Sequence, residues 1–190
     1  MKRDSFSEIY KIDESTDRYM IEIALDQYTD IFNAWDPAPF KRRELNPDLK
    51  LYLEEYSDEI PSKYAIELCF AVPAGTRDER VEEESRIGLK NSFISKRYFL
   101  GKEIKKSNTR MLLFVVIGLV LLWVAKTATS RFGAADASSI LFEGLAITGW
   151  VFLWEAVSLL SFTNRELYHR YQTHKRLQNA PVIFQEAEKY

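Results

Sequence analysis

The stretch that decides the fold is Met111–Thr127, MLLFVVIGLVLLWVAKT, in which no charged residue precedes Lys126. As a helix with a rise of 1.5 Å per residue, this stretch is roughly 26 Å long, enough to cross a thin hydrocarbon core. A second apolar stretch, Ile140–Phe162, ILFEGLAITGWVFLWEAVSLLSF, is roughly 34 Å long by the same arithmetic and spans with tilt. It contains neither Lys nor Arg. Core helices of soluble proteins are rarely so long and apolar, so the two stretches predict a transmembrane hairpin.

We assign residues 111–129 and 140–162 to the two spans and residues 130–139 to the loop between them. Cytoplasmic flanks of spans are enriched in Lys and Arg. Such residues precede the first span and follow the second: Lys96, Arg97, Lys102, Lys105, Lys106, Arg110, Arg165, Arg170, Lys175 and Arg176. We therefore expect a multi-pass protein of the cell (inner) membrane, in contact with the lipid bilayer, with both termini cytoplasmic and the loop outside.

The overall composition hides this organisation. The mean hydropathy of -0.26 averages a polar first half with two apolar blocks. The net charge of -2 gives no global basic bias, so no nucleic acid partner is expected. A lone cysteine, Cys69, cannot form an intramolecular disulfide and suits a reducing compartment.

The residues before the hairpin predict a small cytoplasmic α/β domain at 1–76. Apolar residues alternate in 19–25 and again in 64–72, which is the period of a half-buried strand. Between them, Asn46 followed by Pro47 is the pattern of a helix N-cap and first helical residue. The expected fold class is therefore an α+β membrane protein, a two-helix transmembrane hairpin with a small cytoplasmic α/β domain containing a parallel βαβ unit.

Polar helices are expected on both sides of the hairpin. Residues 77–110 contain no proline and predict a stalk helix that runs into the first span, with Glu82–Glu84 on a solvated face. Residues 163–190 predict a cytoplasmic helix, after which 181–184 returns as an edge strand of the same small sheet. In that case the hairpin is inserted within one cytoplasmic domain.

The second span carries a stripe of small and hydroxyl residues, which is typical of helix–helix contacts in lipid. The stripe consists of Gly144, Thr148, Val151, Glu155 and Ser158. Two helices alone bury little surface, so the stripe predicts self-association in addition to hairpin packing. An ionisable residue within a span costs roughly 2.5–3.5 kcal/mol, so Glu155 is expected to face protein or water. Glu155 either lines a pore, proton site or ion site, or it makes a structural hydrogen bond or reaches the cytoplasmic interface.

A second candidate site is the loop WDPAPFKRR at 35–43, where two prolines fix an extended turn beside three consecutive cations. One interpretation is a docking loop for anionic lipid head groups, a partner's acidic surface or a phosphorylated ligand. The other is a rigid loop whose aromatic residues pack against the sheet while the cations are solvated. The candidate residues are Trp35, Phe40, Lys41, Arg42 and Arg43.

The sequence contains no recognisable catalytic centre, and the Walker, GxSxG, HExxH and CxxC motifs are absent. Asp26, Asp30 and Asp36 are explained by turn chemistry, because no further ligand spacing supports a metal. His169 and His174 are five positions apart, which separates them around a helix. We therefore expect no catalytic residue, metal or cofactor, and no enzymatic activity.

Two segments, FNAWDPAPFKRRELNPDL at 32–49 and GWVFLWEAVSLLSF at 149–162, resemble parts of an uncharacterised family of small bacterial two-pass membrane proteins. The resemblance implies a bacterial membrane protein with two spans. It implies no activity and no role for any residue.

Three functions fit these features. The first is a non-enzymatic homo-oligomeric assembly or scaffold of the inner membrane, whose cytoplasmic domain binds a protein partner or ligand. The second is an ion-conducting pore or membrane effector that the cytoplasmic domain gates, with Glu155 on the path. The third is a membrane-tethered enzyme acting on a nucleotide or phospholipid through Asp26, Asp30 and the basic loop, and it has the least support.

Overall fold

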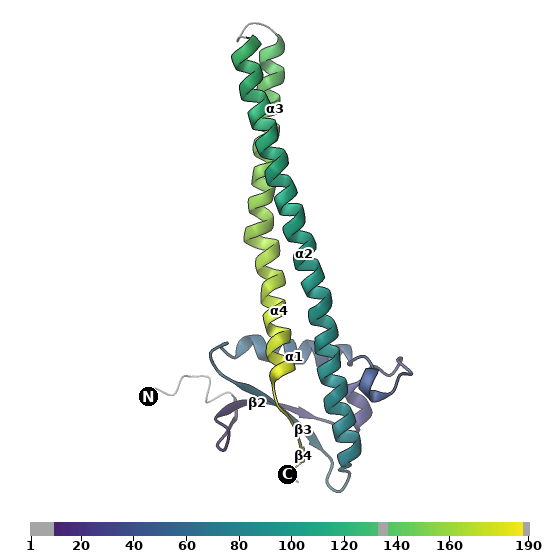
Figure 1. Ribbon diagram of the computed structural model, residues 1–190. Helices are drawn as coiled ribbons and strands as arrows, with labels where there is room; N and C mark the ends of the chain where they lie inside the picture. The colour runs from purple at the N-terminus through teal and green to yellow at the C-terminus, as the bar shows by residue number, and fades with distance from the viewer. Residues whose placement is uncertain (1–9, 133–136, 188–190) are drawn as a thin grey trace. The chain divides into compact units, whose positions relative to one another are not determined.

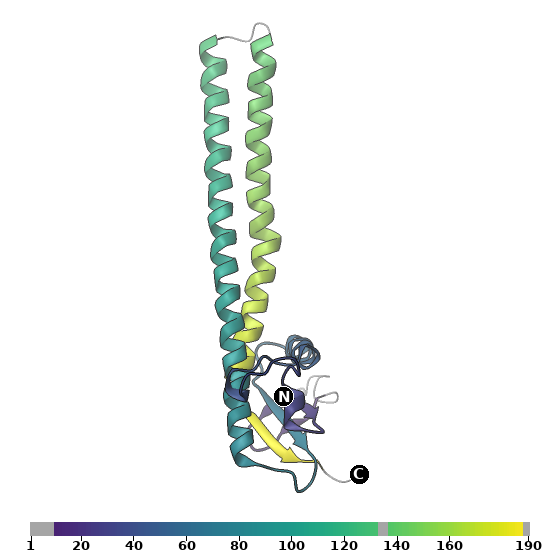
Figure 2. The ribbon, with the colours of Figure 1, turned by 90° about the vertical axis from the view of Figure 1, so that its right-hand side faces the viewer.

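The computed structural model describes residues 10–132 and 137–187 (Figures 1 and 2). It divides into two units, which we treat separately. The head unit comprises Met1–Tyr98 and Tyr171–Tyr190, and the helical unit comprises Phe99–Arg170. The fold class is α+β, with a mixed sheet in the head unit and long apolar helices in the helical unit.

The head unit is built on a four-stranded sheet in the order β1-β2-β3-β4. Its strands are β1 (Ile12–Asp13), β2 (Arg18–Ala24), β3 (Ile66–Val72) and β4 (Val182–Glu186). β1 pairs antiparallel with β2, whereas β2, β3 and β4 run parallel to one another. Both the βαβ unit and the return of the C-terminal segment as a strand beside β3 are therefore confirmed.

The central strand β3 differs from the half-buried strand that its alternation predicts. Leu68 and Phe70 lie in the core as expected, but Glu67 and Cys69, on the opposite face, are also fully buried. Burial raises the pKa of the Glu67 carboxyl and of the Cys69 thiol, the latter to about 11. Cys69 is therefore a protonated, inert thiol at neutral pH.

Helix α1 (Pro47–Glu59) begins where the sequence predicts. Oδ1 of Asn46 accepts a hydrogen bond from the backbone N–H of Asp48 at 2.9 Å, and Pro47 occupies the first turn. The other end of the helix is closed by a distant side chain. The guanidinium of Arg176 donates to the carbonyl oxygens of Ser57 in the last turn and of Ile60 at the C-cap, and also to those of Pro61 and Tyr64 in the segment that follows. These contacts satisfy acceptors that a helix end leaves without partners.

Helix α2 (Glu79–Phe132) is a single helix that contains both the predicted stalk and the predicted first span. Two short 3-10 turns, η2 (Tyr28–Ile31) and η3 (Phe40–Arg42), lie in the loop between β2 and α1. Leu89 and Phe93 of α2 are buried in the head core. Gly88 makes the close approach possible, because a Cβ at this position would lie 2.8 Å from Cε1 of Phe32.

The helical unit contains the rest of α2, then α3 (Ala137–Ser158), a π-helical segment η4 (Leu159–Thr163) and the beginning of α4 (Asn164–Asn179). The helices are longer than predicted, because 130–132 and 137–139 of the expected loop are helical; residues 133–136 lie outside the described residues. Two helical stretches, Glu79–Arg131 and Ile140–Asn179, are long and apolar enough to cross a membrane. Only 11% of the apolar window of each is buried.

We expect Gly88→Ala to destabilise the head unit by about 1–3 kcal/mol, because the new methyl group overpacks the contact with Phe32 and with the carbonyl oxygen of Phe40. Gly101→Ala is the matched control. It lies on the same helix with nothing within 4 Å of its Cβ, so it should gain up to about 1 kcal/mol in helix propensity. Thermal unfolding of the full chain in detergent measures both. Equal unfolding temperatures for the two variants would contradict the close approach.

Candidate functional site

The hairpin of the helical unit is closed by two glycines that face each other. A Cβ at Gly118 of α2 would lie 2.9 Å from the carbonyl oxygen of Gly149, and a Cβ at Gly149 of α3 would lie 3.0 Å from that of Gly118. Small residues allow such close backbone contact in lipid. No sequence motif pairs these two glycines, and the signal available in the sequence is a glycine within each apolar stretch.

A polar contact also joins the two helices of the hairpin, farther from the connecting loop than the glycines. Nδ2 of Asn164 donates to Oδ1 of Asn108 at 2.7 Å, and Asn164 is buried. Each amide lies outside the predicted spans, so no sequence pattern linked them. Together with the edge contact between the rings of Phe114 and Phe152, they bring α2 against the second helical stretch.

The predicted stripe lies away from this closure. Gly144, Thr148, Val151 and Glu155 are exposed, and Ser158 is half-buried. A Cβ at Gly144 meets nothing within 4 Å. The structure thus places the stripe on one face of α3, as the helical spacing predicts, and leaves that face uncovered within one copy.

The loop at 33–45 is held by its own hydrogen bonds. The Asp36 carboxylate accepts from the backbone N–H of Ala38 at 3.0 Å and from that of Glu44 at 2.8 Å. These bonds lower the pKa of Asp36, so it is ionised at neutral pH. Nε of Arg43 donates to the carbonyl oxygen of Ala38 at 2.8 Å. The predicted turn chemistry of Asp36 therefore accounts for the loop's shape.

The five candidate residues of this loop have different environments. Phe40 stacks on buried Phe32, with ring centroids 5.0 Å apart, and the guanidinium of Arg43 lies over the Phe40 ring. Trp35, in contrast, is 93% exposed. The interpretation with both aromatic residues packed against the sheet is thus wrong for Trp35, and Phe40 packs on Phe32, which lies outside the strands. Lys41 pairs with Glu84 at 3.8 Å, and Arg42 is exposed.

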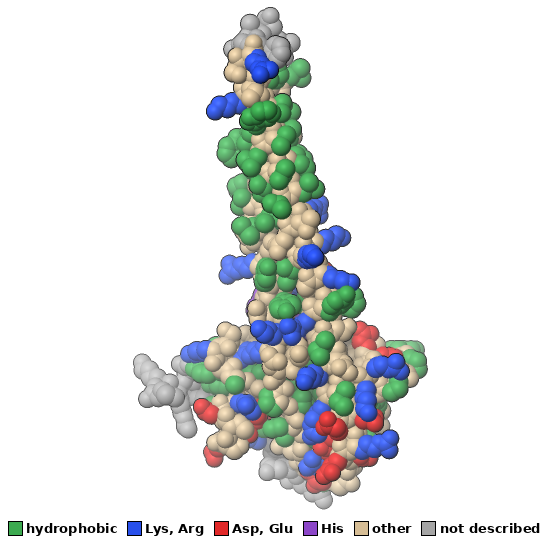
Figure 3. Space-filling model, in the orientation of Figure 1, with side chains coloured by type: hydrophobic (Ala, Val, Ile, Leu, Met, Phe, Trp, Pro, Cys, Tyr) green, Lys and Arg blue, Asp and Glu red, His purple; other side chains and the backbone are tan. Residues whose placement is uncertain are grey.

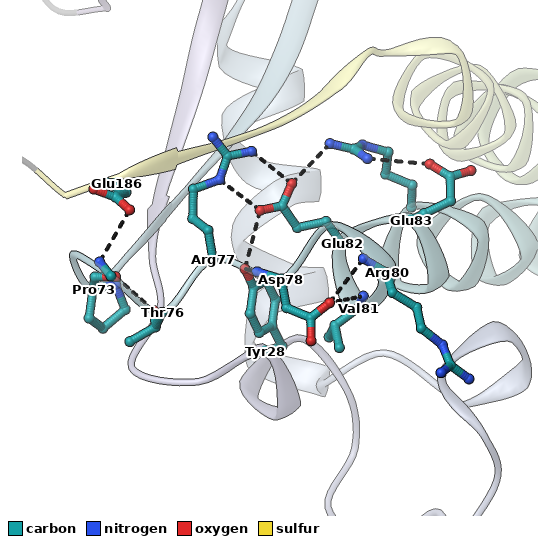
Figure 4. Close-up of polar contacts among 12 residues, drawn as sticks. Tyr28, Pro73, Thr76, Arg77, Asp78, Arg80, Val81, Glu82, Glu83 and Glu186 are labelled. Carbon is teal, nitrogen blue, oxygen red and sulfur yellow. Dashed lines mark hydrogen bonds and ion pairs between the residues drawn. The ribbon is translucent and has the colours of Figure 1, made fainter.

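The third polar feature is a cluster at the start of α2, around the carboxylate of Glu82 (Figure 4). Glu82 is 1% exposed. Arg77 binds it with two bonds, Nε to Oε1 at 2.8 Å and Nη2 to Oε2 at 2.9 Å. Nη2 of Arg86 lies 3.4 Å from Oε2, and the Tyr28 hydroxyl donates to Oε1 at 3.2 Å. The expectation that Glu82 is solvated is wrong, because three side chains replace water around it.

The cluster lies at the carboxyl ends of the parallel strands. Tyr28 follows β2, Arg77 follows β3, and Glu186 ends β4. A Glu186 carboxylate oxygen accepts from the backbone N–H of Gly75 at 3.1 Å. Asp78 caps α2 by accepting from the backbone N–H of Arg80 at 3.0 Å (Figure 4).

This edge of a parallel sheet is where ligands often bind, but its charges are already matched within the chain. Hydrogen bonds from Arg77 lower the pKa of Glu82, and burial raises that of Tyr28. Glu82 therefore stays ionised and Tyr28 protonated at neutral pH, so neither exchanges a proton readily. The arrangement is suited to holding α2 on the sheet rather than to acid–base chemistry.

The remaining predicted polar residues do not converge on one site. Oδ2 of Asp30 accepts from the backbone N–H of Gln27 at 2.8 Å, a local turn bond. His174 is buried in the head unit with Nε2 3.4 Å from Oε1 of Glu54, whereas His169 is exposed in the helical unit. Within the part of the chain that the structure describes, no group of three or more His, Cys, Asp or Glu residues is placed to hold a metal ion.

Comparison of the chain with family models, curated proteins and solved structures finds no match.

We expect Glu82→Gln to destabilise the head unit by about 1.5–3 kcal/mol, because it removes charge-assisted hydrogen bonds from a buried acceptor. Glu83→Gln is the control. Its side chain is 63% exposed and makes one ion pair with Arg86, so it should cost less than about 1 kcal/mol. Chemical unfolding of the full chain in detergent measures the difference.

The same experiment has a pH dependence of known sign. The pKa of Glu82 is lowered in the folded chain, so its stabilisation is present at neutral pH and is lost as the pH falls through that lowered value. The difference in the free energy of unfolding between wild type and Glu82→Gln should therefore become smaller as the pH is lowered. A gap that widens in acid would contradict the assignment.

Proposed function

We propose that the chain is a non-enzymatic, homo-oligomeric assembly protein of the inner membrane. Its hairpin crosses the bilayer, and its head unit is a cytoplasmic binding domain. The observation that carries this proposal is the exposure of large apolar side chains over both helices of the hairpin. On α2 these include Leu112, Leu119 and Trp123, and on α3 they include Ile147, Trp150 and Trp154.

An exposed apolar surface of this extent requires an apolar environment, since soluble monomers rarely show contiguous patches above a few hundred Å². In Figure 3 the apolar side chains of the helical unit form a band between two groups of Lys and Arg. Lys126 and Arg131 lie at the end near the loop, and Lys105, Arg110 and Arg165 are among the cations at the other end. This pattern supports a bilayer around the band.

The same charges support the orientation. The cations before and after the hairpin outnumber those at its loop, which favours a cytoplasmic location for the head unit and both termini.

Self-association is supported by the stripe of small and hydroxyl residues, which the hairpin leaves uncovered. Gly118 and Gly149 are used to close each hairpin, whereas the Gly144–Ser158 stripe is available to another copy. The Glu155 carboxylate on that stripe makes no hydrogen bond or ion pair within the described ranges. A second copy that covers the stripe removes both the exposed small residues and the carboxylate from lipid.

A pore is the second candidate, and the outward position of Glu155 is the observation that favours it. Several copies packed through the stripe would bring their Glu155 carboxylates to a common axis. Ion flux into proteoliposomes that Glu155→Ala abolishes would support a pore. An intact oligomer without flux supports the scaffold.

The assembly is tested by fractionation and mass measurement. We expect the protein to stay in the membrane after alkaline extraction and to be oligomeric when purified in detergent. A protein that is strictly monomeric at every concentration would sink the proposed assembly.

We expect Gly144→Ile to weaken the oligomer. Its dissociation midpoint, the protein concentration at which half of the oligomer has dissociated, should rise at least about tenfold. The larger side chain has open space within its own hairpin and obstructs only a contact between copies. Val157→Ile is the control, because Val157 is exposed on a face of α3 away from the stripe. Mass measurement over a dilution series in detergent gives both midpoints. An unchanged midpoint for Gly144→Ile would remove the stripe from the interface.

A further inference from the structure

Trp35 differs from the other aromatic residues of the 33–45 region because it contributes nothing to its own core. Its neighbours Phe32 and Phe40 pack into the head unit, whereas Trp35 is 93% exposed. Burying a tryptophan removes 150–250 Å² from water, so leaving it exposed forgoes a large stabilisation. Tryptophan is among the residue types most enriched at the anchor positions of protein interfaces.

The loop that carries Trp35 is already ordered. Oδ1 of Asn33 accepts from the backbone N–H of Trp35 at 3.0 Å, and the backbone N–H of Asn33 donates to the carbonyl oxygen of Glu44 at 2.8 Å. At the far side of the loop, Nδ2 of Asn91 donates to the carbonyl oxygen of Lys41 at 2.8 Å. Because the backbone is held in this way, docking through Trp35 costs little additional loop entropy.

The charges beside Trp35 favour a protein surface over anionic lipid. Two of the three consecutive cations are engaged within the chain, Lys41 by Glu84 and Arg43 by Ala38 and Phe40. Arg42 is exposed and makes no ion pair within the described residues, whereas Lys41 is exposed but paired with Glu84. A tryptophan with one available cation matches an apolar pocket with an acidic rim.

Such a pocket lies at the base of the same loop. A groove of about 280 Å³ is lined by the apolar side chains of Leu45, Pro47 and Leu51. Its polar lining has two carboxylates and one ammonium group, together with one amide: Glu44, Glu54, Lys50 and Asn33. Leu51 is 56% exposed although it faces this groove. The groove therefore has both the apolar floor and the carboxylates that Trp35 and Arg42 require.

We propose that Trp35 of one copy docks in the Leu45–Leu51 groove of a neighbouring copy, with Arg42 facing the neighbour's Glu44. This inference rests on the proposed homo-oligomeric assembly and assigns its contact between head units. The loop that carries Trp35 and the groove share Asn33 and Glu44. Each copy therefore presents the loop and the groove on neighbouring surfaces. A second copy is the occupant that charge identifies, because one chain carries both the unpaired Arg42 and the groove with two carboxylates.

The first test is dilution of the full-length protein in detergent, with the oligomer followed by mass measurement. Trp35→Ala should raise the dissociation midpoint at least about thirtyfold, the effect of removing an interface anchor. Trp35→Phe should restore part of the loss. If wild type is oligomeric and Trp35→Ala has an unchanged midpoint, this contact is overturned while the proposed assembly stands. A wild type that is monomeric throughout overturns both.

A charge exchange separates a contact between copies from a folding defect. Arg42→Glu and Glu44→Arg should each weaken the oligomer, because each places like charges across the contact. The double variant should recover the wild-type midpoint, since it restores the pair in the opposite sense. Failure of the double variant to recover, with an unchanged unfolding temperature, contradicts the pairing of Arg42 with Glu44.

Cross-linking tests the geometry directly. Copies carrying Ala34→Cys, an exposed position that leaves Trp35 in place, are mixed with copies carrying Leu51→Cys and oxidised, while the native Cys69 is buried and does not react. We expect a disulfide-linked heterodimer. Replacing Leu51→Cys with Arg80→Cys, whose side chain is 88% exposed elsewhere on the head unit, should give none. Equal yields for the two mixtures would overturn the proposed contact.

Discussion

The parallel pairing of β4 with β3 is the constraint on which the rest of the structure depends. Parallel neighbours cannot be joined by a tight turn, so the chain leaves the sheet after Val72 and returns at Val182. The connection between them contains the whole helical unit. The head core is complete only after the return, when Phe184 stacks on Phe70 with ring centroids 5.3 Å apart. The hairpin is thus an insertion within a domain rather than an appendage to its end.

Polar side chains, buried Glu82 and half-buried Arg176, fix the two ends of this connection. Where α2 starts, Glu82 receives hydrogen bonds from Arg77 and Tyr28, and Arg86 donates in turn to the carbonyl oxygen of Val182 at 3.1 Å. Where α4 ends, Arg176 closes the C-terminus of α1. A polar group buried without hydrogen-bond partners destabilises the fold, and one with partners is satisfied only in a specific geometry. Glu82 and Arg176 therefore specify where the connection leaves the sheet and where it rejoins it. Apolar packing alone would define these two positions less sharply.

Features with a local pattern were predictable from the sequence. Helix α1 with its Asn46 cap, the parallel βαβ unit, the uninterrupted α2 and the return of β4 all follow from periodicity and turn chemistry. The environment of Glu82 was not predictable, because Tyr28 is far from it in the sequence and a run of three glutamates resembles a solvated face. The contact of Gly118 with Gly149 and the exposure of Trp35 depend on tertiary packing, which no local spacing records.

The carboxylates of Glu82 and Glu155 differ in whether their charge is stabilised within one copy of the chain. Glu82 is buried with two arginines and a tyrosine, so its charge is stabilised within a single copy. Glu155 has no such partner among the described residues, and in the membrane hairpin proposed above an uncompensated charge costs roughly 2.5–3.5 kcal/mol. Its compensation must come from outside the copy, as water, a lipid head group or another chain. A contact between head units through Trp35 would favour the last of these, because it holds neighbouring chains together and raises the effective concentration of their hairpins.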